Sequence, residues 1–453
     1  MTVGAQTERT GWADRMLAAI SLACLPGALA LVAIGALSNL AGVALGLAGA
    51  ALVVAGGWYA VSRRGGPRVA GVTAAAAGCG VLVAALIVAD LTWWRIAAAI
   101  ALGAVAAATA HSALGRAAAQ TPEPHRTLVP PAVHPTLIMN PVSGGGKATR
   151  FRLREECERR GIEAIVLEKG DDLVKLAEDA VARGTDVLGM AGGDGSQALV
   201  ADVARRHDIA LVVVPAGTRN HFALDLGLDR EDVLGALAGF GEAVERTIDL
   251  ATVNGRVFVN NASLGAYARI VQSPEYRDAK ARTAAAMLPD ILGPDAEPLD
   301  LRYVGLDGRS HDDAQMILVS NDPYQLDDLD GRGTRERIDL GVIGVVTARI
   351  GSAVDAERFA ALNAVGQIRR YHGWDEWTAK RFEIASDGPV QIGIDGESLA
   401  MDPPLVFESL PGALRVRLPR HATGRSPAAV RLTRSTPGRL WRLAVAGDPA
   451  VAR

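Results

Sequence analysis

The first quarter of the chain is almost purely apolar. Between residues 16 and 62 the sequence contains no Asp, Glu, Lys or Arg, a length that a helix in a soluble core would not reach. About 20 apolar residues are enough to cross the ~30 Å hydrocarbon layer of a bilayer. The pattern therefore predicts a four-helix transmembrane region within residues 1–115, with spans at about 16–37, 40–61, 69–91 and 94–110. A cleaved signal peptide for the first segment and a soluble Ala-rich bundle for the rest remain possible interpretations.

Arginine is concentrated on one side of the predicted spans, as the positive-inside rule expects of cytoplasmic segments. The other connections hold only Asp90 and Arg95. Both termini are then cytoplasmic, and we expect a multi-pass protein of the cell membrane with its soluble domains in the cytoplasm. The arginines on the cytoplasmic side are Arg9, Arg15, Arg63, Arg64, Arg68, Arg116 and Arg126.

A proline-rich segment, residues 116–135, follows the last predicted span. Five prolines fall between residues 121 and 135, and such a composition is typical of a semi-rigid, extended linker. The segment is expected to hold a soluble module near the bilayer surface.

Strands and helices alternate in the next part of the chain, residues 136–245. Helical patterns at about 148–160 and 171–182 separate apolar runs of strand length. This alternation predicts an α/β, Rossmann-like domain with a parallel sheet, and such sheets bind ligands beyond the carboxyl ends of their strands. The expected strands are 136–139, 163–167, 187–191 and 210–214.

Closely spaced strands replace this alternation after residue 245. They predict a second domain at residues 246–420, a mostly antiparallel β-sandwich with one helix near 353–365, followed by a basic tail at 421–453. The expected strands are 247–253, 257–262, 300–304, 315–320, 342–348, 381–385, 390–394 and 413–418.

Three glycine-bearing loops follow strands of the α/β domain: residues 140–147 (NPVSGGGK), 192–196 (GGDGS) and 215–223 (PAGTRNHFA). Glycine lets the backbone approach a bulky anion, and a following helix directs free N–H groups and its positive dipole end at that anion. We expect the loops to form one phosphate-binding pocket. The residues predicted to bind the cofactor are Asn140, Pro141, Ser143, Gly144, Gly145, Gly146, Lys147, Gly192, Gly193, Asp194, Gly195, Ser196, Gly217, Thr218 and Asn220.

Individual side chains in these loops carry separate expectations. Asp194 is expected to meet a phosphate-bound metal or a reacting hydroxyl. Lys147 either steadies a phosphate or is an exposed lysine at the start of a helix. Asn140 and Asn220 are expected to tie loops together through side-chain hydrogen bonds more than to contact substrate. The first loop is not a Walker P-loop, because Ala148 stands where Ser or Thr would bind magnesium.

Composition excludes some partners. A net charge of −3 and a pI near 6.3 argue against nucleic acid, because no basic stripe with interleaved aromatic residues is present. Cys24, Cys79 and Cys157 lack the spacing of a zinc site or of a disulfide framework.

Taken in order, NPVSGGGK, GGDGS and PAGTRNHFA resemble the catalytic signature of the diacylglycerol kinase and sphingosine kinase family of lipid kinases, in a membrane-attached bacterial form. The resemblance covers about residues 136–419. It implies transfer of the ATP γ-phosphoryl group to a lipid hydroxyl, with diacylglycerol as the favoured acceptor and phosphatidic acid as the product. It also implies Mg²⁺ and a catalytic cleft between the two soluble domains.

The resemblance assigns roles to three carboxylates. The matching Asp-Gly-Glu element of the family faces the nucleotide and supplies the proton acceptor. That role carries onto Glu397, with Asp395 as its neighbour or as an alternative base. Asp194 is then expected to hold Mg²⁺ or to act beside it.

Two positions depart from the family. His221 stands where many members place an Asp beside the nucleotide. Leu340 stands where bacterial members usually carry an Asp of a structural magnesium site, which leaves Asp339 as the local carboxylate for a metal. These departures keep open a membrane-anchored nucleotide-binding module or scaffold with little turnover.

Short motifs leave the substrate and the role of the tail undetermined. The GGDG element is shared with NAD kinases, so a kinase of a soluble metabolite fused to an anchor is a further hypothesis. The basic tail is either solvated or rests on anionic lipid, where each arginine contributes on the order of 1 kcal/mol. The lipid substrate and the bilayer are the expected partners. A homodimer is compatible with the sequence.

Overall fold

The computed structural model describes the chain in several stretches, which begin in the apolar first quarter and end in the basic tail. They are residues 12–38, 40–62, 66–88, 93–119, 127–265, 300–326, 334–350, 355, 358–359, 362, 367–424, 426 and 436–446.

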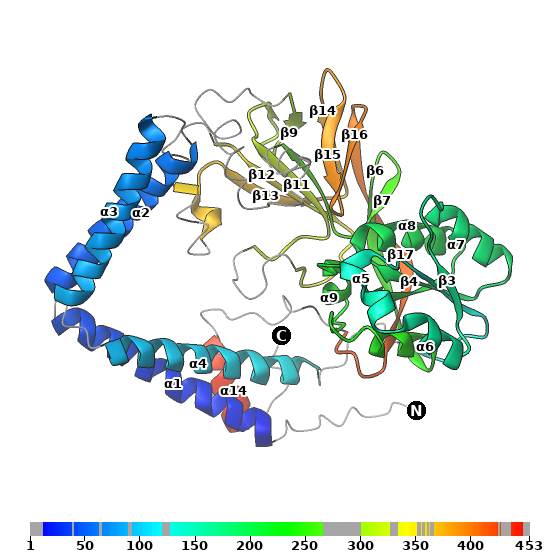
Figure 1. Cartoon of the computed structure of the whole chain (residues 1–453), viewed down its shortest axis with the longest axis horizontal. Helices are drawn as coiled ribbons and strands as arrows, with labels where there is room; N and C mark the ends of the chain where they lie inside the picture. The colour runs from blue at the N-terminus through cyan, green and yellow to red at the C-terminus, as the bar shows by residue number, and fades with distance from the viewer. Residues whose placement is uncertain are drawn as a thin grey trace.

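Four helices precede the soluble body, and they form two antiparallel pairs, α1 with α4 and α2 with α3 (Figure 1). Within the described residues, three stretches are long and apolar enough to cross a membrane: Trp12–Ile34, Gly66–Ala85 and Ala97–Leu114. The expectation of four spans is therefore corrected to three. In the second helix the described apolar stretch, Ala44–Gly57, is shorter than a bilayer requires. The helices are α1 (Trp12–Ser38), α2 (Leu40–Ser62), α3 (Gly66–Val88) and α4 (Trp93–Ala119).

Glycines bring α2 and α3 into backbone contact. A Cβ on Gly56 would lie under 3.0 Å from backbone atoms of Gly71 and Ala75, and a Cβ on Gly78 would lie equally close to Gly49. The two contact points are one heptad apart on each helix. Lipid tails are as apolar as the helices, so the hydrophobic effect does not drive helices together in a bilayer. Small residues instead let the helices pack closely.

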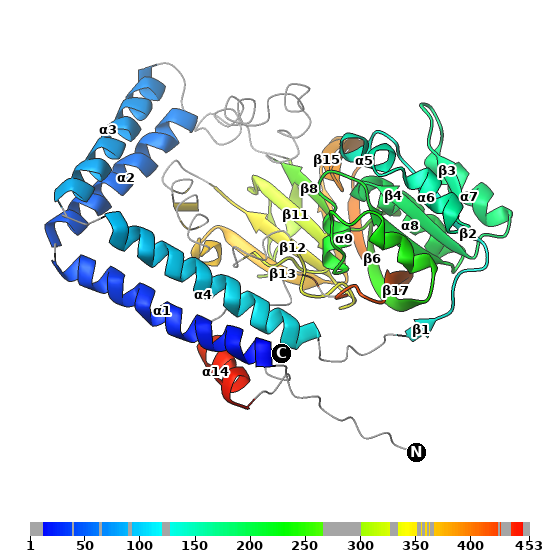
Figure 2. The same cartoon turned by 60° about the horizontal axis from the view of Figure 1, so that its bottom comes forward.

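A helix in the basic tail, α14 (Thr436–Ala446), packs against α1 and α4 (Figure 2). Its Leu440 and Leu443 are buried in a cluster with Ala18 of α1 and Leu114 of α4. Arg15 donates from Nε and Nη2 to the last carbonyl groups of α14, at 2.9 and 3.0 Å, which caps orphan acceptors at a helix end. This part of the tail is therefore folded, contrary to the interpretation of a solvated tail.

The larger sheet of the described body runs from the α/β part into the sandwich. Its order is β10-β9-β14-β17-β5-β4-β2-β3, and β6 pairs with β17, β1 and β7 beside this path. Strands β2 to β5 are parallel, and β17 joins β5 in the same direction. Its strands are β1 (Thr127–Val129), β2 (Pro135–Met139), β3 (Glu163–Val166), β4 (Val187–Gly192), β5 (Ala210–Pro215), β6 (Ala243–Val253), β7 (Arg256–Phe258), β9 (Arg302–Val304), β10 (Ser310–His311), β14 (Arg381–Ala385) and β17 (Leu405–Pro419).

The second sheet is antiparallel and has the order β13-β12-β11-β8-β15-β16 among the described strands. A cluster that includes Phe258, Tyr303, Phe382 and Phe407 fills the space between it and the antiparallel part of the larger sheet. The expected sandwich is therefore present. Its strands are β8 (Asn261–Gly265), β11 (Met316–Asn321), β12 (Ile343–Ala348), β13 (Trp374–Ala379), β15 (Val390–Ile394) and β16 (Glu397–Met401).

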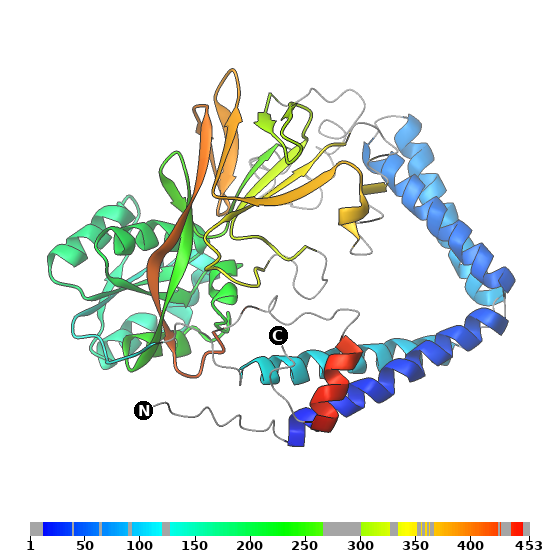
Figure 3. The ribbon, with the colours of Figure 1, turned by 180° about the vertical axis from the view of Figure 1, so that it is seen from behind.

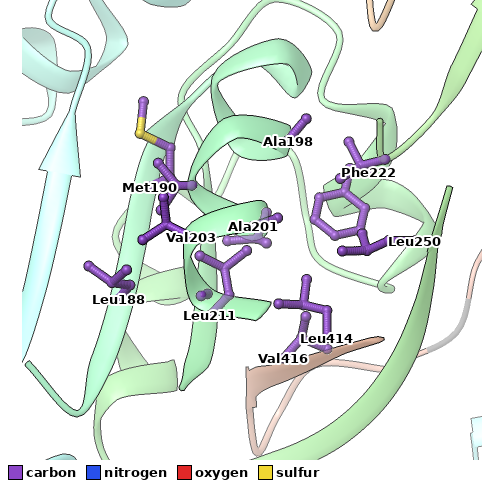
Figure 4. Packing of buried hydrophobic residues seen from close by; sticks show 14 of the residues in the cluster. Leu188, Met190, Ala198, Ala201, Val203, Leu211, Phe222, Leu250, Leu414 and Val416 are labelled. Carbon is purple, nitrogen blue, oxygen red and sulfur yellow. The ribbon is translucent and has the colours of Figure 1, made fainter. Parts of the chain in front are cut away.

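Alternate residues of the parallel strands face two helical layers. Leu188, Met190 and Leu211 pack with α8 and Phe222 on one face (Figure 4), whereas Leu137 and Val212 face the other. The parallel α/β domain was predicted correctly, apart from the helix expected at 148–160, which a left-handed Arg152 (φ 49°) divides. The helices are α5 (Ser143–Arg150), α6 (Leu153–Arg159), α7 (Leu173–Ala182), α8 (Asp194–Arg206), α9 (His221–Asp225), η1 (Gly235–Phe240) and η2 (Ile368–Arg370).

The segment expected as a linker, 116–135, contains regular structure. It includes the last residues of α4, the strand β1, which pairs with β6, and the first residue of β2. The helix expected near 353–365 lies largely outside the described residues.

Candidate active site

The glycine loops follow strands at the switch point of the parallel sheet. The order β3-β2-β4-β5 means that the chain moves to one side of β2 first and to its other side next. Loops that follow two such neighbouring strands diverge and leave a crevice, where open α/β sheets bind their ligands. The loops of residues 140–147 and 192–196 follow β2 and β4, and the loop of residues 215–223 follows β5.

The three loops are in backbone contact. A Cβ on Gly144 would lie under 3.0 Å from the carbonyl oxygens of Ala216 and Gly217, and a Cβ on Gly217 would lie as close to Gly193. Any side chain at Gly144 or Gly217 would push the loops apart. The structure therefore joins the segments at one place, as a shared pocket requires.

The first loop turns through consecutive left-handed glycines. Gly144, Gly145 and Gly146 have φ angles of 56°, 70° and 79°, a region that residues with a Cβ rarely adopt. Before them, Oδ1 of Asn140 accepts the N–H of Val142 at 3.1 Å. A Cβ on Gly145 would meet no atom within 4 Å. The side chain of Asn140 thus holds the start of the loop, and space is open beside Gly145, the second of the three glycines.

Asn220 fixes the third loop from within. It is buried, and its Oδ1 accepts the N–H of Gly217 at 2.9 Å. Its Nδ2 donates to the carbonyl oxygens of Pro215 and Gly217 at 3.2 and 2.9 Å. The printed bonds of Asn140 and Asn220 lie within their own loops, so a role in tying the loops to one another stays a prediction. With both Nδ2 hydrogens donated within the loop, Asn220 shapes it and is not free to donate to a cofactor.

Lys147 is buried, so the interpretation as an exposed lysine is wrong. Its Nζ lies 3.3 Å from Oε1 of Glu231 and 3.3 Å from the carbonyl oxygen of Arg230. The ammonium group therefore ties the first loop to the turn before η1. A contact between Lys147 and a phosphate stays a prediction.

Asp194 begins α8 and reaches the start of α9. Its two carboxylate oxygens accept the N–H groups of His221 and Phe222, each at 3.1 Å. Two such bonds leave further lone pairs on the carboxylate. Mg²⁺ commonly takes one or two protein carboxylates together with substrate phosphates, so Asp194 fits a phosphate-bound magnesium as its single protein ligand.

Glu397 comes from the strand-rich half and lies against the second loop. A Cβ on Gly195 would lie 2.8 Å from its Oε1. Its Oε2 accepts a hydrogen bond from Nη2 of Arg256 at 3.1 Å, and both side chains are partly exposed. The two halves of the body thus place Asp194 and Glu397 at the same loop. No local pattern in the sequence marks Arg256, because its partner lies in a different hairpin.

Asp395 lies in the same turn but points into the protein. Its carboxylate accepts the N–H groups of Val259, Asn260 and Asn261 at 2.9, 2.8 and 3.1 Å. Burial raises the pKa of Asp395 to about 7, and the charge of Asp194 adds to that shift against these hydrogen bonds. With both oxygens engaged by the backbone, Asp395 supports the turn that carries Glu397.

His221, at the position where the resemblance leads one to expect an Asp, lies beside Asp194. Its Nδ1 is buried and has no hydrogen-bond partner among the described residues. Burial lowers the pKa of His221 below its usual value near 6.5, although the charges of Asp194 and Asp225 oppose this. The ring is therefore neutral at physiological pH, and the position provides no charge to bind a cation.

The carboxylates near Leu340 do not fit a structural metal site. Oδ1 of Asp339 accepts from Arg337 at 2.7 Å, and Oδ1 of Asp322 accepts the N–H of Leu340 at 3.2 Å. Burial and the charge of Asp249 raise the pKa of Asp322 to about 8, so this group is protonated at neutral pH. Within the described residues, no group of three or more His, Cys, Asp or Glu side chains is arranged to hold a metal. The assignment of Asp339 as a ligand is not supported.

The glycine loops lie in a segment that matches a known family. Residues 134–253 match the model of the diacylglycerol kinase catalytic domain. This part of the chain is therefore similar to that catalytic domain, and the match ends before the turn that holds Glu397.

The chain is also similar to individual proteins. The chain is 35% identical over 135 residues to a diacylglycerol kinase of Bacillus subtilis (strain 168), a match that covers 28% of this chain and 45% of that protein. It is 28% identical over 286 residues to a "Probable lipid kinase YegS-like" of Stenotrophomonas maltophilia (strain K279a), which covers 57% of this chain and 87% of that protein. The chain thus spans less than half the length of the former.

A solved structure can also be aligned with this chain. The crystal structure of a diacylglycerol kinase from Bacillus anthracis str. Sterne aligns with 64% of this chain and 98% of its own, at a TM-score of 0.44 and 17% identity.

Proposed function

We propose that this chain is an ATP-dependent lipid kinase that transfers the γ-phosphoryl group of ATP to a lipid hydroxyl, with diacylglycerol as the acceptor. The family match covers the segment that holds the glycine loops. The observation that carries the proposal is the position of Glu397, whose carboxylate lies against Gly195 in one of those loops. A proton acceptor and a phosphate cradle thereby occur side by side.

Each element has a task in this reaction. Phosphoryl transfer asks the protein mainly for positioning and for neutralisation of charge. The N–H groups of the first and third loops bind the phosphates, and the start of α8 adds its dipole. Glu397 accepts the proton of the lipid hydroxyl while the hydroxyl oxygen attacks the γ-phosphorus and ADP leaves. Arg256 holds Glu397 at the loop, and Asp194 supports α9 through its two amide contacts.

Mg²⁺ bound with ATP would neutralise the phosphate charge, with Asp194 as its protein ligand. Glu397 is the better base on geometric grounds, because it is partly exposed at the loop, whereas the carboxylate of Asp395 is held by three backbone N–H groups.

Membrane attachment is part of the proposal. Three described helices are long and apolar enough to cross a membrane, and the end of α4, the start of α1 and α14 lie together. The body that follows α4 therefore begins near the end of the helical region where α1 and α14 meet. Trp441 and Arg442 lie on the exposed side of α14. They fit contact with an anionic membrane surface.

Labelled ATP supplied to membranes that contain the protein tests the reaction. We expect label in phosphatidic acid when diacylglycerol is added and no comparable transfer to sphingoid bases, prenols or NAD. Glu397→Gln should lower kcat by about 10²- to 10⁴-fold while ATP binding persists. Transfer to NAD alone would support a soluble-metabolite kinase, and ATP binding without transfer to any acceptor would support a scaffold.

A further inference from the structure

We propose that the buried ion pair of Arg335 and Asp225 is the positioning device that sets Glu397 against the glycine loops. This inference rests on the proposed function for its catalytic meaning. Asp225 is the last residue of α9, next to the third loop, and Arg335 lies on the sandwich side. The pair thus connects the two halves of the site from behind.

The pair is fully buried and fully bonded. The relative exposure of Arg335 is 0% and that of Asp225 is 3%. Nε and Nη2 of Arg335 lie 2.8 and 2.6 Å from Oδ2 of Asp225, and the backbone N–H of Arg335 donates to Oδ1 at 2.8 Å. Two guanidinium nitrogens thus share Oδ2 while the backbone N–H of the same residue takes Oδ1, so the contact fixes the orientation of the planar guanidinium as well as its distance.

The other donors of Arg335 reach the segment that holds Asp395. Nη1 donates to the carbonyl oxygens of Val259 and Asn321, each at 2.6 Å, and Nη2 donates to Oδ1 of Asn260 at 2.9 Å. Four guanidinium N–H groups therefore donate hydrogen bonds, and Nη2 also forms the ion pair with Asp225. An arginine held in this way cannot be displaced without leaving buried groups unpaired.

One peptide group transmits the position. The carbonyl of Val259 and the N–H of Asn260 belong to the same planar unit. Its oxygen accepts from Arg335, and its N–H donates to Asp395 at 2.8 Å. Arg335 therefore sets the plane of this peptide, and the peptide sets Asp395 in the turn that ends at Glu397.

Helix α9 contacts both sides of the site. Asp194 of the second loop accepts the N–H groups at its start, and Asp225 at its end accepts from Arg335. The distance between the phosphate cradle and Glu397 thus depends on a five-residue helix and one ion pair. A displacement of about 1 Å in such a constellation is enough to lower a rate about 100-fold.

The test removes both charges together, because a single substitution would leave an unpaired charge in the interior. In the double variant Arg335→Met with Asp225→Leu we expect kcat to fall about 100-fold, with KM for ATP unchanged. Arg335→Lys, which keeps the charge and loses the planar fork, should lie between this variant and the wild type. The matched control, Arg381→Met with Glu408→Leu, removes an exposed ion pair of 2.8 Å between β14 and β17 and should change neither parameter.

A mutant cycle separates positioning from a structural role. In a Glu397→Gln background the double variant should cause no further loss of kcat, because the group that it positions is already removed. Losses that multiply would overturn the proposal. A double variant that keeps the wild-type kcat would overturn it as well.

Hydrogen exchange supplies a reading that does not depend on activity. We expect the double variant to exchange faster at the amides of residues 259–261 and 395–397, with no change at 192–196. Unchanged exchange at both segments would overturn the proposal even if the wild type transfers no phosphate. A wild type without transfer but with the expected exchange would refute the proposed function alone.

Discussion

Glycine brings backbones together in two regions of this chain, and the two uses differ. In the hairpin of α2 and α3, Gly56 and Gly71 allow two helices to touch. In the soluble body, Gly144 and Gly217 allow three loops to touch. The helices have already satisfied their own N–H and C=O groups, so their contact is packing alone. The contact between the loops instead brings together the segments that follow β2, β4 and β5, where the phosphate site is proposed.

The difference shows that glycine serves two structural roles in this chain. At Gly217 a methyl group would displace the loops of the proposed phosphate site, whereas at Gly56 it would separate two helices whose backbone is otherwise unchanged. Substitution by alanine therefore separates function from assembly.

The largest effect is expected at the loops. Gly217→Ala places a Cβ under 3.0 Å from Gly193, so the second and third loops must move apart. We expect kcat/KM for ATP to fall about 100-fold, measured with labelled ATP. Gly388→Ala is the control, because its Cβ would meet no atom within 4 Å. A wild-type value for Gly217→Ala would show that the loop contact is irrelevant to the nucleotide.

A smaller effect is expected in the helical hairpin. Gly56→Ala and Gly71→Ala should each destabilise the α2–α3 contact by about 1–3 kcal/mol, as overpacking does. Thermal unfolding of the protein in detergent measures this. Gly57→Ala and Gly80→Ala are the matched controls, since their added methyl groups would meet nothing within 4 Å. Equal shifts in all four variants would contradict close helix contact as the cause.

The soluble body also contains a buried group that titrates, Asp395, whereas the glycine contacts contain no titratable group. Burial raises the pKa of Asp395 to about 7 from an ordinary value of 3.8. Between these values the unfolded carboxyl group is ionised while the folded one keeps its proton, so unfolding releases a proton. The contribution of Asp395 to stability is greatest below pH 4 and is lost as the pH rises through 7. From about pH 5 to 8 the Tm of the wild type should fall more steeply than that of Asp395→Asn. Parallel curves would contradict the shift.

The smallest effect concerns the cysteines, which divide between the two regions. Burial raises the pKa of Cys157 to about 12, and the thiolate is the reactive form. Cys157 should therefore stay unmodified by a maleimide at about pH 8, with activity unchanged. Cys79 of α3 is exposed and should react in detergent but not with a membrane-impermeant reagent in intact vesicles. Mass spectrometry reads both, and rapid modification of native Cys157 would contradict its burial.

Local patterns in the sequence predicted the parallel strands and the loops, because apolar runs and glycines carry that information within a few residues. They did not predict β13 and β16, the edge strands of the second sheet. Trp374–Ala379 and Glu397–Met401 lack the alternation of buried and exposed residues that marks a half-buried strand. The prediction of four spans was reduced to three, because the apolar stretch of α2 among the described residues is Ala44–Gly57.

The contacts that complete the site could not be predicted. Arg335 and Asp225 are 110 positions apart and Arg256 and Glu397 are 141 positions apart, so no local spacing connects them. Their residue types are ordinary for a surface, and only the fold makes Arg335 the most deeply buried cation described. The catalytic roles of Asp194 and Glu397 stay predictions until they are measured.

Strand β17 has a consequence for synthesis on the ribosome. It pairs with β14 and β6 on the sandwich side and runs parallel to β5 at Val416 (Figure 3). Until Leu405–Pro419 has emerged, β5 exposes an unpaired edge, which is a site for pairing with other chains. The nascent α/β domain must therefore wait for its own late strand, and a pause in translation before it would favour aggregation over folding.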